Sequence, residues 1–141
     1  MKINALVFFL LCGIVLFGCS KNDDPTETAT TPATTFSYYQ FPCSNESTAK
    51  GDSFAIYVQD NDVLIWHYNL VTSCCDTIRG EFKQSAETLK VYEKYDGVVC
   101  YCLCSFTLSY KIDDLNPGSY FLKIFAETDS FLLKDTTIVI P

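Results

Sequence analysis

Six cysteines beyond residue 40 are the side chains best suited to chemistry in this sequence. One is isolated, two are adjacent and three recur at every second position: Cys43, Cys74, Cys75, Cys100, Cys102 and Cys104. In an extended strand, residues two apart point to the same side, so the last three thiols would share one face. Neighbours on that face are about 6.5–7 Å apart at their α-carbons and point in parallel, which disfavours bonds between them. Each of these three thiols therefore requires a partner elsewhere.

Disulfide bonds are the chemistry that this pattern favours. An even number of cysteines in an exported domain is typical of a disulfide framework, with buried free thiols as an alternative. The simplest consistent set of bonds joins Cys43, Cys74 and Cys75 to the three alternating cysteines. The sequence does not choose the individual pairs.

A soft-metal site is the second chemistry that the cysteines allow, because clustered thiolates suit Zn(II) or Cu(I). The Cys-x-x-Cys pairs typical of structural zinc are absent from the sequence, and its single histidine, His67, is expected to be an ordinary surface or core residue. We therefore expect no cofactor, with zinc or copper as the alternative. The ligands would then be Cys74, Cys75, Cys100, Cys102 and Cys104.

The sequence lacks the groups on which common enzyme mechanisms depend. A hydrolase triad needs a nucleophile, a base and an orienting group, yet no Gly-x-Ser-x-Gly elbow accompanies the one histidine. Glycine-rich phosphate loops are absent as well. The acidic pairs at 60/62 and 113/114 flank expected turns, where carboxylates serve solvation and turn hydrogen bonding. We predict that the protein is not an enzyme.

The elements that must position the cysteines are β-strands. From Phe36 onward apolar and polar residues alternate with period two, and no window shows the spacing of an amphipathic helix. Short strands separated by Asp, Asn, Gly and Pro predict an all-β sandwich of about seven strands. The expected segments are 54–59, 64–70, 77–83, 88–94, 98–112, 119–128 and 131–140.

Two of these segments carry specific expectations. Leu64, Trp66, Tyr68 and Leu70 should share one face. The segment 98–112 would be near 50 Å as one strand, so a bulge or a switch between sheets near Cys104 to Phe106 is expected. If its register is unbroken, the thiol face is the core face and continues through Phe106, Leu108, Tyr110 and Ile112.

Aromatic residues gather just before the first of these strands, at Phe36, Tyr38, Tyr39 and Phe41. We expect them to form an edge strand that packs onto the domain. The alternative is a patch that contacts a protein or a glycan.

A turn motif indicates the kind of sandwich. Leu115, Pro117, Gly118 and Tyr120 resemble the Leu-x-Pro-Gly-x-Tyr turn of immunoglobulin-like and fibronectin-like domains. The resemblance implies a tyrosine corner, in which the hydroxyl of Tyr120 bonds back to the chain just before its strand. It also implies that Trp66 is the buried tryptophan of a central strand.

The N-terminal residues indicate where in the cell the protein is located. Lys2 precedes a short apolar segment, Ile3 to Phe17, which has the form of a secretory signal and is shorter than a membrane span. The tetrad Leu16 to Cys19 resembles the lipobox of bacterial lipoproteins, which implies that Cys19 is diacylated and becomes the mature N-terminus. Two acyl chains suffice for stable anchoring, so the expected partner is a membrane.

These features divide the chain into a lipoprotein signal peptide (1–18), a lipidated N-terminus with a disordered tether (19–35) and a β-sandwich domain (36–141). The tether is rich in Thr and Pro and has no large apolar residue. Its start, Ser20 to Asp24, resembles the signal that exports Bacteroidetes lipoproteins to the cell surface. The net charge of −7 excludes nucleic acid as a probable partner.

As a whole, the chain resembles small lipoproteins of Bacteroidetes that carry Cys-Cys, then Cys-x-Cys-x-Cys, then the Leu-x-Pro-Gly-x-Tyr turn, here between Val63 and Phe125. The resemblance implies a fold and a location in the outer membrane, at the cell surface or the periplasmic face. We predict a lipid-anchored, non-enzymatic binding or adhesion module with an envelope protein or glycan as partner. A thiolate metal-binding lipoprotein and a protease-inhibitor-like domain are the alternatives.

Overall fold

The computed structural model describes residues 33–44, 51–98 and 100–141 of the chain. Within them lie eight β-strands and no helix. The predicted signal peptide, Cys19 and nearly all of the predicted tether lie outside the described residues. The strands are β1 (Thr35–Gln40), β2 (Ser53–Gln59), β3 (Asp62–Ser73), β4 (Asp76–Ser85), β5 (Thr88–Gly97), β6 (Leu103–Asp113), β7 (Gly118–Ala126) and β8 (Phe131–Ile140).

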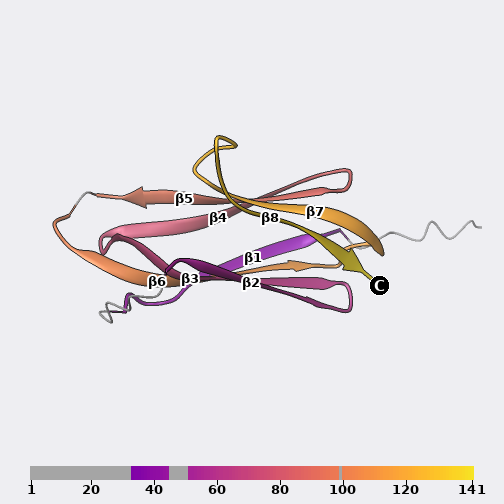
Figure 1. Ribbon diagram of the computed structural model, residues 1–141, viewed down its shortest axis with the longest axis horizontal. Coiled ribbons are helices and arrows are strands. Elements are labelled where there is room, and N and C mark those ends of the chain that lie inside the picture. The colour runs from indigo at the N-terminus through magenta and orange to yellow at the C-terminus, as the bar shows by residue number, and fades with distance from the viewer. Residues whose placement is uncertain (1–32, 45–50, 99) are drawn as a thin grey trace, which may run out of the picture. The chain divides into compact units, whose positions relative to one another are not determined.

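The strands form two four-stranded sheets that pack face to face (Figure 1). One sheet has the order β1-β6-β3-β2 and the other has the order β4-β5-β7-β8. All neighbours are antiparallel except β5 and β7, which are parallel. The predicted all-β sandwich is confirmed, and the aromatic segment after the tether adds the eighth strand as an edge strand, β1.

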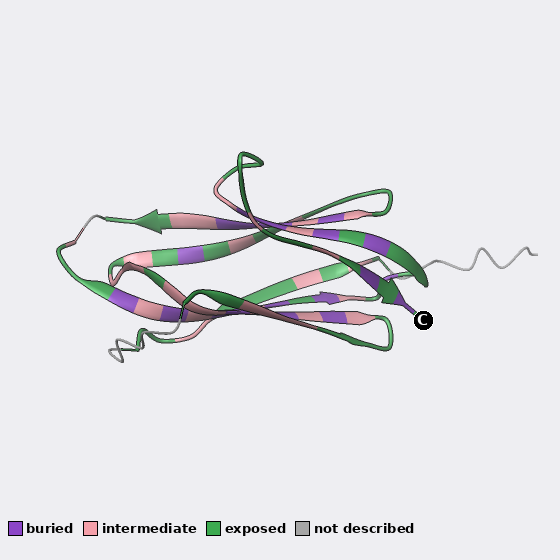
Figure 2. Cartoon of the chain, viewed as in Figure 1, coloured by how far each residue is buried: buried purple, intermediate pink, exposed green. Residues whose placement is uncertain are grey.

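Alternating side chains from both sheets fill the space between them, as the banded burial in Figure 2 shows. On β6 the buried face begins with Cys104 and continues through every second residue to Ile112. The prediction that the thiol face is the core face is therefore confirmed for Cys104. Strand β6 begins only at Leu103, so the expected strand over 98–112 was too long at its start, and Cys100 and Cys102 lie outside it.

The expected bulge lies on the neighbouring strand, not on β6. The pairing of β3 with β6 shifts between His67 and Leu70, so that two residues of β3 oppose one of β6. Asn69, one of the two, has a positive φ of 58°, a conformation that asparagine tolerates better than most residues. The bulge turns the chain, and Leu70 beyond it packs against the core.

The predicted face of β3 was therefore wrong in two respects. The core-facing residues before the bulge are Val63, Ile65 and His67, each without measurable exposure. Trp66 is half-buried on the outer face, not in the core, and Leu70 does not share its face. Both registers of this strand carry apolar residues, so alternation alone did not distinguish the inner from the outer face.

The tyrosine corner has the geometry that the turn motif implied. The Tyr120 hydroxyl donates a hydrogen bond of 2.9 Å to the carbonyl oxygen of Asn116. Leu115 is 1% exposed and Tyr120 is 7% exposed, so both anchor the turn in the core at the start of β7. The bond ties the connection between β6 and β7, which crosses from one sheet to the other.

Candidate functional site

An aromatic face lies on the outer side of the β1-β6-β3-β2 sheet. It consists of Tyr39 and Phe41, at and just after the end of β1, and of Trp66 and Tyr68 on β3. The Tyr39 and Phe41 ring centroids are 4.7 Å apart, and those of Phe41 and Trp66 are 5.4 Å apart. Trp66 and Tyr68 stack with centroids 5.8 Å apart and an interplanar angle of 4°. The four rings thus form one continuous surface.

The sheet register explains how rings from β1 and β3 meet, although β6 lies between those strands. Tyr39 pairs with Ser109, and Ser109 pairs with Trp66 on its other side. The backbone N–H of Phe41 donates to the Thr107 carbonyl oxygen at 2.9 Å. Because the side chains of β6 are small here, the larger rings on either side contact each other across that strand.

The aromatic face is accessible, and the residues that pair with its rings are uncharged. Tyr39 is 56% exposed, and the other three rings are half-buried. On β2, Ala55 pairs with Trp66 and Ser53 pairs with Tyr68. The residues beside these two rings on the neighbouring strand are therefore also small and uncharged. A cluster of accessible aromatic rings on one outer face is typical of a contact surface.

The expected edge strand is confirmed for the aromatic segment, whereas the alternative, a patch that contacts a protein or a glycan, stays a prediction. Phe36 faces inward and stacks on Phe82 of the other sheet, with ring centroids 5.4 Å apart, as expected of an edge strand that packs onto the domain. Tyr39 and Phe41 face outward. The contribution of Trp66 and Tyr68 was missed, because the resemblance to immunoglobulin-like domains implied a buried role for Trp66.

The six cysteines of the domain form three disulfide bonds: Cys43–Cys104, Cys74–Cys102 and Cys75–Cys100. Their α-carbons are 5.8, 5.6 and 6.1 Å apart, within the usual range for bridged cysteines. Each bond joins Cys43, Cys74 or Cys75 to one of the three alternating cysteines, which is the division that the sequence favoured. The structure adds the individual pairs, which the spacing left open.

Two of the bridges link the same two connections between the sheets. The chain passes from β3 to β4 through Cys74 and Cys75, and it returns from β5 to β6 through the segment that holds Cys100 and Cys102. The bridges span 28 and 25 residues, and closing one such loop contributes about 3.5 kcal/mol by chain entropy. Once one is closed, the other closes only a ring of a few residues and adds about 2 kcal/mol or less.

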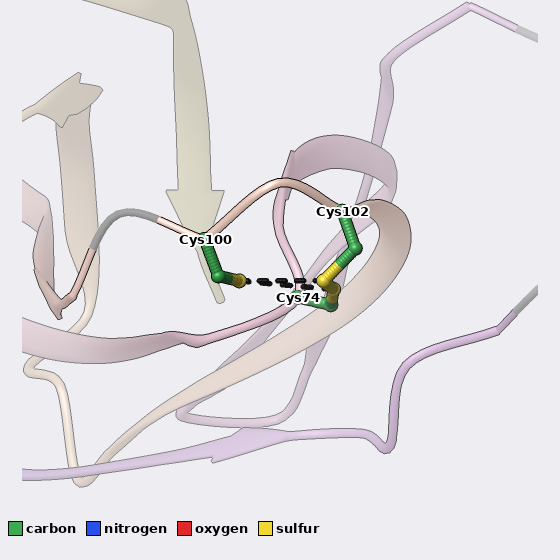
Figure 3. Close-up of side chains that lie close together, drawn as sticks. All are labelled: Cys74, Cys100 and Cys102. Carbon is green, nitrogen blue, oxygen red and sulfur yellow. Dashed lines mark hydrogen bonds between the residues drawn. A yellow bond between two sulfur atoms is a disulfide. The ribbon is translucent and has the colours of Figure 1, made fainter.

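The sulfur atoms of these two bridges are crowded together (Figure 3). Sγ of Cys100 lies 3.3 Å from Sγ of Cys102 and 3.9 Å from Sγ of Cys74. These three atoms lie within 4.8 Å of one another, and they form the one group of possible metal ligands found in the described part of the chain. Two of the five predicted ligands lie outside this group: Cys75, which is bonded to Cys100, and Cys104, which is bonded to Cys43.

A buried polar network lies between the sheets, away from the cysteines. His67 on β3 and Glu93 on β5 are both without measurable exposure, and their Nδ1 and Oε1 atoms are 2.8 Å apart. Nε2 of His67 contacts the carboxylate of Asp52. The Tyr110 hydroxyl donates to Oε1 of Glu93 at 2.9 Å, and the Tyr95 hydroxyl donates to Oε2 at 3.4 Å. The role of Glu93 was missed because its partners come from distant segments.

The charge on the network follows from these contacts. Burial by itself lowers the pKa of His67, but the carboxylates of Glu93 and Asp52 outweigh it and raise that pKa above its ordinary value. Burial together with the adjacent Glu93 carboxylate raises the pKa of Tyr110 and of Tyr95, so both hydroxyls remain donors. His67 has no measurable exposure, so of the two expected places, surface or core, it lies in the core.

Comparison with known proteins identified no relative: no protein family, curated protein or solved structure matches the chain. Among the described residues there is also no helix long and apolar enough to cross a bilayer.

Proposed function

We propose that the protein is a lipid-anchored, non-enzymatic binding module of the outer membrane, and that its aromatic face binds a glycan. The observation that carries this proposal is the parallel stacking of Trp66 and Tyr68 within a continuous surface of four rings. The predicted diacylated Cys19 provides the anchor. The predicted tether leads directly into β1, the strand that contributes Tyr39.

A glycan matches the chemistry of this surface. The faces of sugar rings present C–H groups with partial positive charge, which pack against the negative faces of aromatic rings. The hydroxyl groups of Ser53, Thr107 and Ser109 belong to uncharged residues beside these rings and are available as hydrogen-bond partners. The surface also lacks arginine, which is enriched at the energetic centres of protein interfaces.

The form of the surface favours an extended ligand. Small molecules usually bind in concave pockets that bury most of their area, whereas the four rings lie along the outer face of a sheet. Several adjacent rings on such a face contact successive residues of a polymer. We therefore expect weak binding of single sugars and stronger binding of oligosaccharides.

The test is affinity electrophoresis of the full-length protein in detergent through gels that contain bacterial or plant polysaccharides. Trp66→Ala should weaken retention about 30-fold, because loss of a central aromatic anchor costs about 2 kcal/mol. Phe131→Ala is the matched control, since Phe131 is 65% exposed but lies on β8 in the other sheet. Equal effects of the two substitutions would exclude the aromatic face as the site.

The partner class is tested separately. An envelope protein captured by the wild-type chain and lost with Trp66→Ala would replace the glycan with a protein partner at the same face. If the protein binds neither polysaccharides nor envelope proteins, the proposed binding function is refuted.

A further inference from the structure

The sulfur atoms of Cys74, Cys100 and Cys102 lie on two connections whose ends are fixed by strand pairing in both sheets. Ser73, just before the cysteine pair, is paired with Leu103 in one sheet. Asp76, just after the pair, is paired with Gly97 in the other sheet. The two connections are therefore kept side by side by strand pairing as well as by their bridges. Opening the bridges leaves these flanking pairs in place.

The neighbourhood of Cys100 suits a thiolate. Oγ of Ser73 lies 3.0 Å from its sulfur, so this hydroxyl can donate a hydrogen bond to a negatively charged sulfur. A hydrogen bond of 3.2 Å from the N–H of Cys74 to the Cys102 carbonyl holds two of the three ligand residues together through their backbones. Cys102 is exposed and the other two are half-buried, so solvent and solutes reach the group.

The three sulfurs converge closely enough for one ion to reach them once the bridges are open, as Figure 3 shows. With metal–sulfur bonds of about 2.3 Å, three ligands around one ion stand about 3.8–4.0 Å apart. The sulfurs of Cys74 and Cys100 are already 3.9 Å apart, whereas Cys102 lies closer, at 3.3 Å from Cys100 and bonded to Cys74, and it must move away from both when its bridge opens. Three thiolates suit Cu(I), a soft ion, whereas structural zinc sites take four protein ligands.

We propose that Cys74, Cys100 and Cys102, once reduced, bind one Cu(I) ion. A dithiol reductant transfers two electrons to each of the bridges Cys74–Cys102 and Cys75–Cys100, which breaks both S–S bonds and yields four thiols. The reductant is oxidised to its disulfides. Cu(I) then displaces the protons of three thiols, and its oxidation state does not change. This site is independent of the aromatic face.

The third bridge remains closed in this state. Cys104 is 5% exposed and lies in the core, so a reductant reaches this bridge only from the side of Cys43, which is exposed, and mild reduction is chosen to open the other two first. Its bond to Cys43 therefore continues to tie β6 to the segment after β1. The loaded protein should accordingly keep one disulfide and hold one metal ion.

The test is titration of the full-length protein with Cu(I) after mild reduction under nitrogen, in competition with a chromophoric Cu(I) chelator. We expect about one copper per chain, with the ultraviolet absorption of copper–thiolate bonds. Cys100→Ser should lose the copper, whereas Cys75→Ser, which changes the other cysteine of the same bridge, should retain it. Equal retention by both variants, or equal loss from both, would overturn the assignment.

A second measurement on the wild-type chain does not depend on how the variants fold. Iodoacetamide labelling followed by mass spectrometry should find Cys74, Cys100 and Cys102 protected by Cu(I) and Cys75 labelled. Uniform labelling of all four cysteines in the presence of Cu(I) would refute the site.

Discussion

Replacing Glu93 with leucine should destabilise the domain strongly, because its carboxylate is the centre of the buried network. It accepts hydrogen bonds from two tyrosine hydroxyls and faces the His67 imidazole at 2.8 Å. Removing one partner of a buried ion pair costs about 3–5 kcal/mol, since the remaining charge stays buried without compensation. His67→Leu should cost a similar amount, because it leaves the Glu93 carboxyl group without its imidazole partner between the sheets.

The double variant should be more stable than either single variant. With both charges removed, no ion is left buried, and an apolar pair of similar volume is often neutral in such a position. Asp52 is 48% exposed and regains water. The remaining cost comes from the hydroxyls of Tyr110 and Tyr95, at about 1 kcal/mol or somewhat more each. We therefore expect about 4 kcal/mol for each single change and about 2–3 kcal/mol for both together.

Urea denaturation of the oxidised protein at pH 6, followed by far-ultraviolet circular dichroism, measures this difference. With a denaturant slope of about 2 kcal/mol per molar urea, each single variant should lower the midpoint by about 2 M and the double variant by about 1 M. If the double variant instead loses the sum of the two single shifts, about 4 M, the two residues do not interact and the proposed charge pairing is refuted.

Three further outcomes are expected. The folded state raises the pKa of His67, so between the ordinary and the raised pKa the folded protein holds a proton that the unfolded chain has released. The stability that this proton contributes is complete below the ordinary histidine pKa and is lost as the pH rises through the raised value. The free energy of unfolding should fall by at most about 1.4 kcal/mol per pH unit. Urea midpoints measured from pH 5 to 9 should show this decline in the wild type, and its persistence in His67→Leu would contradict the assignment. Removing the Cys75–Cys100 bridge with the double variant Cys75→Ser, Cys100→Ser should cost about 2 kcal/mol or less of the free energy of unfolding. Removing both bridges of the two connections should cost about 5 kcal/mol, more than the sum of the two single losses. Additive losses in thermal unfolding would show that the bridges act independently. Cys19→Ala should move the protein from the membrane to the soluble fraction after cell disruption, and continued membrane association would exclude lipid as the anchor.

The domain was predictable where local pattern carries the information. Alternation with period two defined most strand positions, and the turn around Tyr120 indicated the tyrosine corner that the structure contains. The division of the six cysteines into two groups followed from the direction of side chains along a strand. Each of these inferences concerns residues that are close together in the chain.

The inner and outer faces of β3 were not predictable in this way. Val63 and Ile65 alternate with Leu64 and Trp66, so either register offers an apolar face to the core. The packing of the second sheet selected the first register, and the bulge at Asn69 reversed the facing of Leu70. The same choice moved Trp66 to the outer face.

The sequence by itself determined that this chain is an all-β domain with a cysteine framework, because strand periodicity and turn chemistry are local properties. Only the tertiary structure decided which residues act together. The aromatic face joins β1 and β3 across β6, the sulfur cluster joins two connections between the sheets, and Glu93 meets His67 from the opposite sheet. Contacts between distant segments depend on how sheets pair and pack, and the spacing of residues along a strand does not encode that arrangement.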